Sequence, residues 1–219
     1  MFKLSLNNLK MSCSVCRAST SKLVNGMCVD CYLDNYRPSK VENIPWVISE
    51  SFKQGKPWLH EHEKTIVNVE LAKAIRTHNF KKDEKKNGFV ISFNDEELFV
   101  PFSVDAIDDL AVKSGILSGK WLIYRERAEI DPVWKMVGKA TFVDELGGSA
   151  KVSTIYQNKT RHAICVYTKI YLDLGDVERI REKLYDMGFT ENLCYKPDIY
   201  TYLGIYYRTT SLSACRYRK

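Results

Sequence analysis

The chain has 219 residues, a formal net charge of +6, and apolar and charged fractions of 45% and 27%. This length suffices for one substantial core and a small additional module, and the composition excludes a disordered or fibrous protein. The sequence lacks any run of about 18 uncharged apolar residues. Its N-terminus is also too polar for a secretory signal. We therefore expect a cytoplasmic protein that does not cross a membrane.

Two Cys-x-x-Cys pairs lie near the N-terminus, Cys13 with Cys16 and Cys28 with Cys31. Each pair can place two thiolates about 2.3 Å from one zinc ion, and the turn signal Asn25-Gly26 brings the second pair back to the first. Four thiolates close the coordination sphere, so we predict a structural Zn²⁺ on which the folding of this short module depends. A redox-active dithiol pair is the alternative interpretation.

The cysteine module resembles the short zinc ribbons of archaeal translation and RNA-processing proteins. We assign residues 1–36 to this zinc ribbon, residues 37–45 to a linker with two prolines, and residues 46–219 to a second domain. Among the remaining cysteines, Cys165 is expected to be a small buried hydrophobic residue. Cys194 and Cys215 have no recognisable partners, so cysteine usage indicates reducing surroundings.

The first elements expected in the second domain are a helix and a hairpin. Apolar residues within 63–79 recur at helical spacing. Residues 89–93 and 97–102 alternate around Asn94-Asp95, which predicts a β-hairpin. The run of mixed charge at 81–86 is interpreted as a solvated loop.

Capping residues mark three further helices, with one strand among them. Ser103 is expected to cap a helix that stops at Gly115, and residues 118–125 then form a strand. Asp131 and Asp176 are the expected N-caps of the two helices that follow.

A central hairpin follows from two β-rich runs, 150–156 and 163–168, whose connection carries Lys159, Arg161 and His162. The second run is almost wholly apolar, which predicts a strand at the centre of a sheet. The tyrosine-rich residues 199–207 are expected to form a last strand. The order of elements indicates an α+β fold with a mostly antiparallel sheet.

Several motifs of the second domain carry a family resemblance: G-K-W-L-I at 119–123, D-x-x-W at 131–134, A-K-V-S at 150–153, R-H-A-I-C-V-Y-T at 161–168 and Y-K-P-D-I-Y-T-Y-L-G-I-Y at 195–206. Together they resemble the family of the basophilic-leukaemia-expressed protein, roughly from Trp46 to Tyr207 and outside the zinc ribbon. That family is similar in fold to the cap-binding translation initiation factors. The resemblance implies a curved, mostly antiparallel sheet backed by helices.

Cap-binding factors stack the modified guanine between two tryptophans and hold its phosphates with basic residues. Strand alternation places Trp121 with Arg125 on one face of their strand and Tyr200 with Tyr202 on one face of theirs, and we expect these residues and Lys151 to form an aromatic and basic sheet face. The candidate residues for binding nucleic acid or phosphate are Lys120, Trp121, Arg125, Trp134, Lys151, Lys159, Arg161, His162, Lys196, Tyr200 and Tyr202. The alternative is that the aromatic residues simply pack beneath helices.

These features together predict a non-catalytic RNA- or nucleotide-binding protein associated with translation or the ribosome. The basic C-terminal tail and the zinc ribbon would add contacts to phosphates, and the ribbon could also bind a protein partner. A protein-interaction module is one alternative. The other is an enzyme acting on a phosphorylated substrate, because members of the resembled family have been labelled phosphothreonine lyases. That chemistry would use Lys151 as base and His162 as acid.

Overall fold

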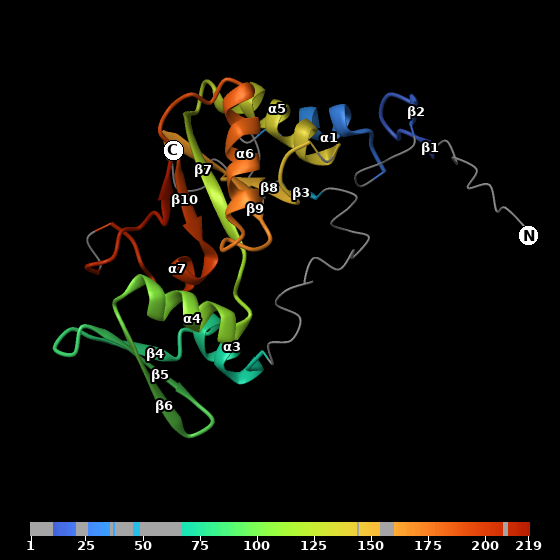
Figure 1. The fold of residues 1–219 in the computed structure, drawn as a ribbon. Helices are drawn as coiled ribbons and strands as arrows, with labels where there is room; N and C mark the ends of the chain where they lie inside the picture. The colour runs from blue at the N-terminus through green and yellow to red at the C-terminus, as the bar shows by residue number, and fades with distance from the viewer. Residues whose placement is uncertain are drawn as a thin grey trace, which may run out of the picture. The chain divides into compact units, whose positions relative to one another are not determined.

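The structure is a computed structural model that describes residues 11–20, 26–35, 37, 46–48, 67–143, 145–153, 160–207 and 210–219. The chain divides into two compact units, Met1–Lys53 with Tyr124–Ile164 and Gln54–Ile123 with Cys165–Lys219. Both units combine helices with β-strands, and antiparallel pairing occurs in each (Figure 1). The predicted α+β class is therefore confirmed. The predicted linker, apart from Arg37, lies outside the described residues.

The first unit joins the cysteine-bearing segment to a helix and a sheet segment. Its complete elements are β1 (Met11–Ser12), β2 (Ser19–Thr20), α1 (Val29–Asn35), β3 (Trp46–Ile48), α5 (Ile130–Phe142) and β8 (Ser149–Val152). Strands β1 and β2 form a short antiparallel hairpin, and β3 pairs antiparallel with β8. Helix α5 contacts α1, β3 and β8, and α1 lies beside it in Figure 1. The cysteine-bearing segment thus packs on a helix 100 residues further along the chain.

The second unit contains a three-stranded sheet with two helices and part of a larger sheet. Its complete elements are α3 (Val69–Arg76), β4 (Phe80–Asp83), β5 (Gly88–Phe93), β6 (Glu96–Pro101), α4 (Val104–Ser114), α6 (Leu174–Asp186), β10 (Cys194–Pro197), α7 (Asp198–Tyr202) and β11 (Tyr217–Arg218). The predicted hairpin is confirmed as β5 and β6. Helix α4 begins and ends as predicted, because Ser103 Oγ accepts from Ala106 N at 3.3 Å and Gly115 is left-handed at φ +66°.

The larger sheet has the strand order β11-β10-β7-β9-β8-β3, with β7 (Gly119–Glu126) and β9 (Arg161–Thr168) in the middle. Each of these two strands has residues in both units. Most of β9 is buried, so the prediction of a central strand from its apolar run is confirmed.

Four local predictions were wrong. The solvated loop predicted at 81–86 was wrong for residues 81–83, which belong to β4 and pair with β5, whereas residues 84–86 lie in a turn. Helix α5 begins at Ile130 with Glu129 as its N-cap, so Asp131 lies in the first turn instead. Helix α6 is capped by Asp173, whose Oδ1 accepts from the N–H of Asp176 at 3.2 Å. Residues 198–202 form α7 and not a strand.

The two cysteines without a predicted partner form a disulfide. Cys194 on β10 is bonded to Cys215, with 5.4 Å between the Cα atoms. The bond holds the C-terminal segment against β10, where β11 adds an edge strand. Cys165 is reduced and buried, as predicted. Within the described residues, no helix is long and apolar enough to cross a membrane.

Candidate functional site

The four N-terminal cysteines come together as predicted. The sulfur atoms of Cys13, Cys16, Cys28 and Cys31 all lie within 4.8 Å of one another. The first pair lies on the β1–β2 hairpin, and the second lies at the start of α1. A tetrahedron with 2.3 Å zinc–sulfur bonds has edges of about 3.8 Å. The cluster therefore has the size that a four-thiolate metal site requires, and Cys16 Sγ and Cys28 Sγ are 3.8 Å apart.

The electrostatics of this cluster also favour a cation. The backbone N–H of Cys28 donates to Cys13 Sγ at 3.2 Å, and this hydrogen bond lowers the pKa of the Cys13 thiol to about 6. Hydrogen bonding with the Cys28 and Cys16 side chains raises the pKa of Cys31 to about 12. The raised pKa means that the Cys31 thiol resists losing its proton, and a bound metal ion would favour its thiolate form.

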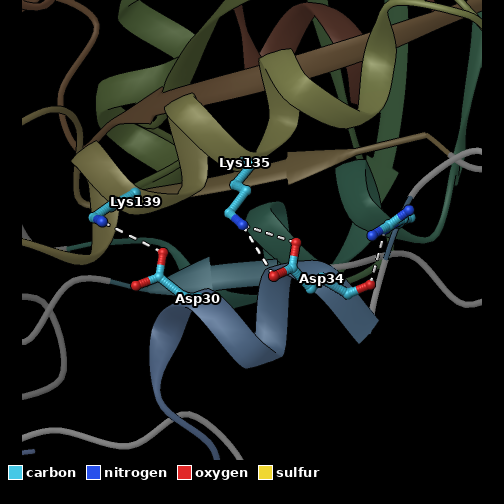
Figure 2. A network of polar contacts seen from close by, with 5 residues as sticks. Asp30, Asp34, Lys135 and Lys139 are labelled. Atoms are coloured by element: carbon cyan, nitrogen blue, oxygen red, sulfur yellow. Dashed lines mark hydrogen bonds and ion pairs between the residues drawn. The ribbon is translucent and has the colours of Figure 1, made fainter. Parts of the chain in front are cut away.

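Helix α1 is attached to α5 by apolar contacts and two ion pairs. Lys135 Nζ lies 2.8 Å from Asp34 Oδ1, and Lys139 Nζ lies 3.3 Å from Asp30 Oδ1 (Figure 2). Both pairs are substantially exposed, so each contributes less than about 1 kcal/mol. Leu33 of α1 is buried and contributes more by apolar burial. The cysteine cluster is thus a structural part of the first unit.

A second polar cluster lies between β7 and β10 in the second unit. Lys120 and Lys196 are directly opposite each other in the antiparallel register, and both are buried, at 8% and 5% exposed. The ammonium of Lys120 forms an ion pair with Asp198, the first residue of α7, and donates to Thr201 Oγ1 at 3.2 Å. Asp198 also accepts from Ser118 Oγ. The Asp198 carboxylate is therefore already ion-paired with Lys120 of β7.

Lys196 has a different environment from Lys120. Its Nζ lies 3.5 Å from the centroid of the Tyr206 ring. Within the part of the chain that the structure describes, this ammonium has no hydrogen-bond acceptor. Burial and then the like charge of Lys120 lower the pKa of Lys196 to about 8, and Asp198 opposes the shift. The Asp198 carboxylate is thus ion-paired with Lys120 and acts on Lys196 only as a nearby opposite charge.

The tryptophans proposed for base stacking belong to the core. Trp121 is 0% exposed, and its Nε1 donates to the carbonyl of Val177 in α6 at 3.0 Å. Trp134 is also 0% exposed, on the inner side of α5. Neither ring offers a surface on which a base could stack. The alternative interpretation, that the aromatics pack beneath helices, is correct for Trp121, and Trp134 is a core residue that lies on a helix itself.

The remaining predicted aromatic and strand residues are scattered. Tyr200 is buried and Tyr202 half-buried, both on α7 instead of the expected strand. Arg125 is half-buried at the end of β7, with its Nη1 2.8 Å from the carbonyl of Tyr124. Lys151 is half-buried on β8, in register with Trp46.

The proposed phosphate-binding cluster beside the central hairpin does not gather at one point. Lys159 lies outside the described residues. Arg161 is exposed and pairs with Glu126 at 3.4 Å, whereas His162 is fully buried with its Nδ1 3.0 Å from the carbonyl of Ser153. A substrate could not reach His162 as a general acid. Its buried Nε2 has no hydrogen-bond partner among the described residues.

Two basic residues in the described part of the C-terminal tail form ion pairs. Arg216 Nη2 lies 2.9 Å from Asp108 Oδ2, and Lys219 pairs with Glu178. Arg218 is in β11, paired with Cys194 of β10. The tail is therefore a folded edge of the sheet and not a free basic arm.

Among the described residues that were predicted to bind nucleic acid or phosphate, Lys120 and Lys196 lie directly opposite each other on neighbouring strands. Sequence reasoning missed Asp198, Thr201 and Tyr206 as their neighbours. The run Lys196-Pro197-Asp198 contained a usable signal, because the residue before proline is extended and a carboxylate then opens the next helix.

These observations define an α+β protein with a four-cysteine cluster and a buried pair of lysines. The family model of the basophilic leukemia-expressed protein Bles03 matches residues 43–204. The chain belongs to this family. The lysine pair and Asp198 lie inside the matched region, whereas the four cysteines and Cys215 lie outside it.

Proposed function

We propose that this protein binds the phosphate groups of RNA or a nucleotide without catalysing a reaction, and that Lys196 and Lys120 supply the binding charge. The observation that carries the proposal is the placement of two buried lysines directly opposite each other, with the Asp198 carboxylate ion-paired to Lys120 and not to Lys196. A buried positive charge without a full complement of acceptors is costly. A bound phosphate would supply the missing negative charge and hydrogen-bond acceptors.

The recessed position of these lysines favours a terminal phosphate over an internal one. At 5% exposure, Lys196 is reached more easily by a 5′-phosphate or a free nucleotide than by a phosphodiester inside a strand. Tyr206 and Tyr207 are 50% and 77% exposed, and they offer aromatic surface on which a base can stack. In this proposal tyrosines replace the buried tryptophans as the stacking residues of a fold similar to the cap-binding factors.

The cysteine cluster has a structural part in the proposal. Four thiolates leave no open position for substrate, and the size of the cluster fits Zn²⁺. We therefore assign the metal as a structural zinc ion that stabilises the N-terminal segment and its packing against α5. The phosphothreonine lyase alternative is not favoured, because its general acid would be the fully buried His162.

Fluorescence anisotropy with short labelled RNAs tests the proposal. Wild-type protein should bind a 5′-phosphorylated RNA more tightly than the same RNA with a 5′-hydroxyl. Lys196→Met should weaken binding to the 5′-phosphorylated RNA about tenfold or more and reduce the salt dependence. Lys183→Met, which removes an exposed lysine from α6, is the matched control. Equal binding of both RNAs by the wild-type protein would overturn the proposal.

A further inference from the structure

The Lys196 amine has the surroundings of a reactive amine as well as those of an anion-binding group. Its Nζ faces the Tyr206 ring, and the residue is 95% buried, since 5% is exposed. Lys120 stands opposite it and takes the Asp198 carboxylate for its own ion pair. An ammonium in these surroundings loses its proton easily, because the neutral amine needs neither hydration nor a counter-ion.

The shifted pKa agrees with this geometry. With a pKa of about 8, about a quarter of the Lys196 side chains are neutral at pH 7.5. An ordinary lysine is neutral in only about one case in a thousand at that pH. The neutral amine is the nucleophilic form, so a substantial fraction of the Lys196 side chains can react as nucleophiles at this pH.

We propose that Lys196 forms an imine with small carbonyl compounds that carry a phosphate group. The Nζ lone pair attacks the carbonyl carbon while the C=O electron pair moves to oxygen, giving a carbinolamine. The two hydrogens of the amine leave with that oxygen as water, so the products are one imine and one water. No oxidant or reductant takes part. The neighbouring Lys120 ammonium supplies positive charge for the phosphate group.

This activity rests on the same lysine as the proposed function but does not require that RNA binds. The probe is pyridoxal 5′-phosphate, added at less than one equivalent to the full-length protein at pH 7.5. Borohydride then reduces each imine to a stable secondary amine, and peptide mass mapping locates it. The expected result is labelling of Lys196 at least about tenfold above exposed Lys183. Pyridoxal, which lacks the phosphate, should label Lys196 less.

Two variants test whether the labelling of Lys196 comes from its reactive amine and not only from the accessibility of a lysine side chain. Lys196→Arg keeps the positive charge and should abolish labelling at this position. Lys120→Met should lower labelling of Lys196 at least about threefold, because Asp198 is then left to pair with Lys196 and to raise its pKa. Labelling spread evenly over exposed lysines would overturn the inference, even if RNA binds as proposed. Selective labelling of Lys196 without RNA binding would support the inference and overturn the proposed function alone.

Discussion

Lys120 and Lys196 stand directly opposite each other on antiparallel strands, and the Asp198 carboxylate is ion-paired with Lys120. Strand interiors rarely bury two like charges in register, because each ammonium raises the cost of the other. The Tyr206 ring offsets part of that cost for Lys196.

Removal of the Lys196 charge should stabilise the protein at neutral pH. The pKa of Lys196 falls from its ordinary 10.5 to about 8 on folding, so the folded state binds fewer protons than the unfolded state between these values. Wild-type stability should therefore rise relative to Lys196→Met as pH rises from about 8 to about 10.5, and the full penalty should be present below pH 8. Urea unfolding of both proteins across this range measures the difference. A constant difference would contradict the assigned environment.

The cysteine cluster should bind one zinc ion per chain. Cys16→Ser and Cys28→Ser should each lower the zinc content measured by mass spectrometry and destabilise the first unit, because a three-thiolate site holds the metal less tightly. Cys165→Ala is the control, since Cys165 is a reduced cysteine outside the cluster and its loss should leave the zinc content unchanged. Purified protein without zinc, even when expressed with added metal, would contradict the assignment.

Apolar packing should hold α1 on α5 more strongly than the two ion pairs do. Leu33 is 2% exposed, so Leu33→Ala should cost about 2–4 kcal/mol of unfolding free energy. Asp34→Asn breaks the exposed pair with Lys135 and should cost less than about 1 kcal/mol. Chemical denaturation of the two variants side by side gives the comparison. A larger loss for Asp34→Asn would reverse this ranking.

The disulfide between Cys194 and Cys215 should stabilise the C-terminal edge of the sheet. It closes a loop with a sequence separation of 21, for which chain entropy predicts about 3 kcal/mol. Cys215→Ser should lower the melting temperature under oxidising conditions and make it insensitive to dithiothreitol, whereas wild-type protein should melt lower when the reductant is added. A wild-type melting temperature that does not respond to dithiothreitol would argue against a stabilising role.

Trp121 should act in the core and not in binding. Its fluorescence should be protected from acrylamide and unchanged by RNA, because its ring is fully buried and its N–H is bonded to Val177. Trp121→Phe should lower stability by about 1–3 kcal/mol through the lost volume and the orphaned carbonyl, and leave RNA affinity unchanged. Strong quenching of Trp121 by RNA would restore the tryptophan-stacking interpretation.

Features that depend on neighbouring residues could be predicted from the sequence, whereas features that depend on contacts between distant residues could not. Helix α4 begins after Ser103 and ends at Gly115 as expected, because capping depends on neighbouring backbone groups. The choice between Asp173 and Asp176 as a cap was beyond a single sequence, since both are good caps three residues apart. Alternation placed Trp121 on one side of its strand but could not say which side α6 covers. The four-cysteine cluster was predictable because metal-ligand spacing is itself local.

The pairing of Lys120 with Lys196 also could not be predicted from local sequence. Lys120 and Lys196 were both candidates, but their pairing depends on the register between strands more than 70 residues apart, with Lys196 facing Lys120. The tyrosine-rich segment after Pro197 has strand composition and yet forms α7, which brings Asp198 and Thr201 to Lys120. Tertiary contacts overrode the local β-propensity there.

The central claim is that Lys196, in its ammonium form, binds a terminal phosphate. The groups that face it are Lys120 from β7, Asp198 from α7 and the Tyr206 ring. The most direct test is the ratio of affinities for 5′-phosphorylated and 5′-hydroxyl RNA, measured at pH 7 and pH 9.5 for wild-type protein and Lys196→Arg. Wild-type protein should prefer the phosphate at pH 7 and lose most of that preference at pH 9.5, whereas Lys196→Arg, which stays charged, should keep its preference. A wild-type preference that is the same at both pH values would contradict the claim.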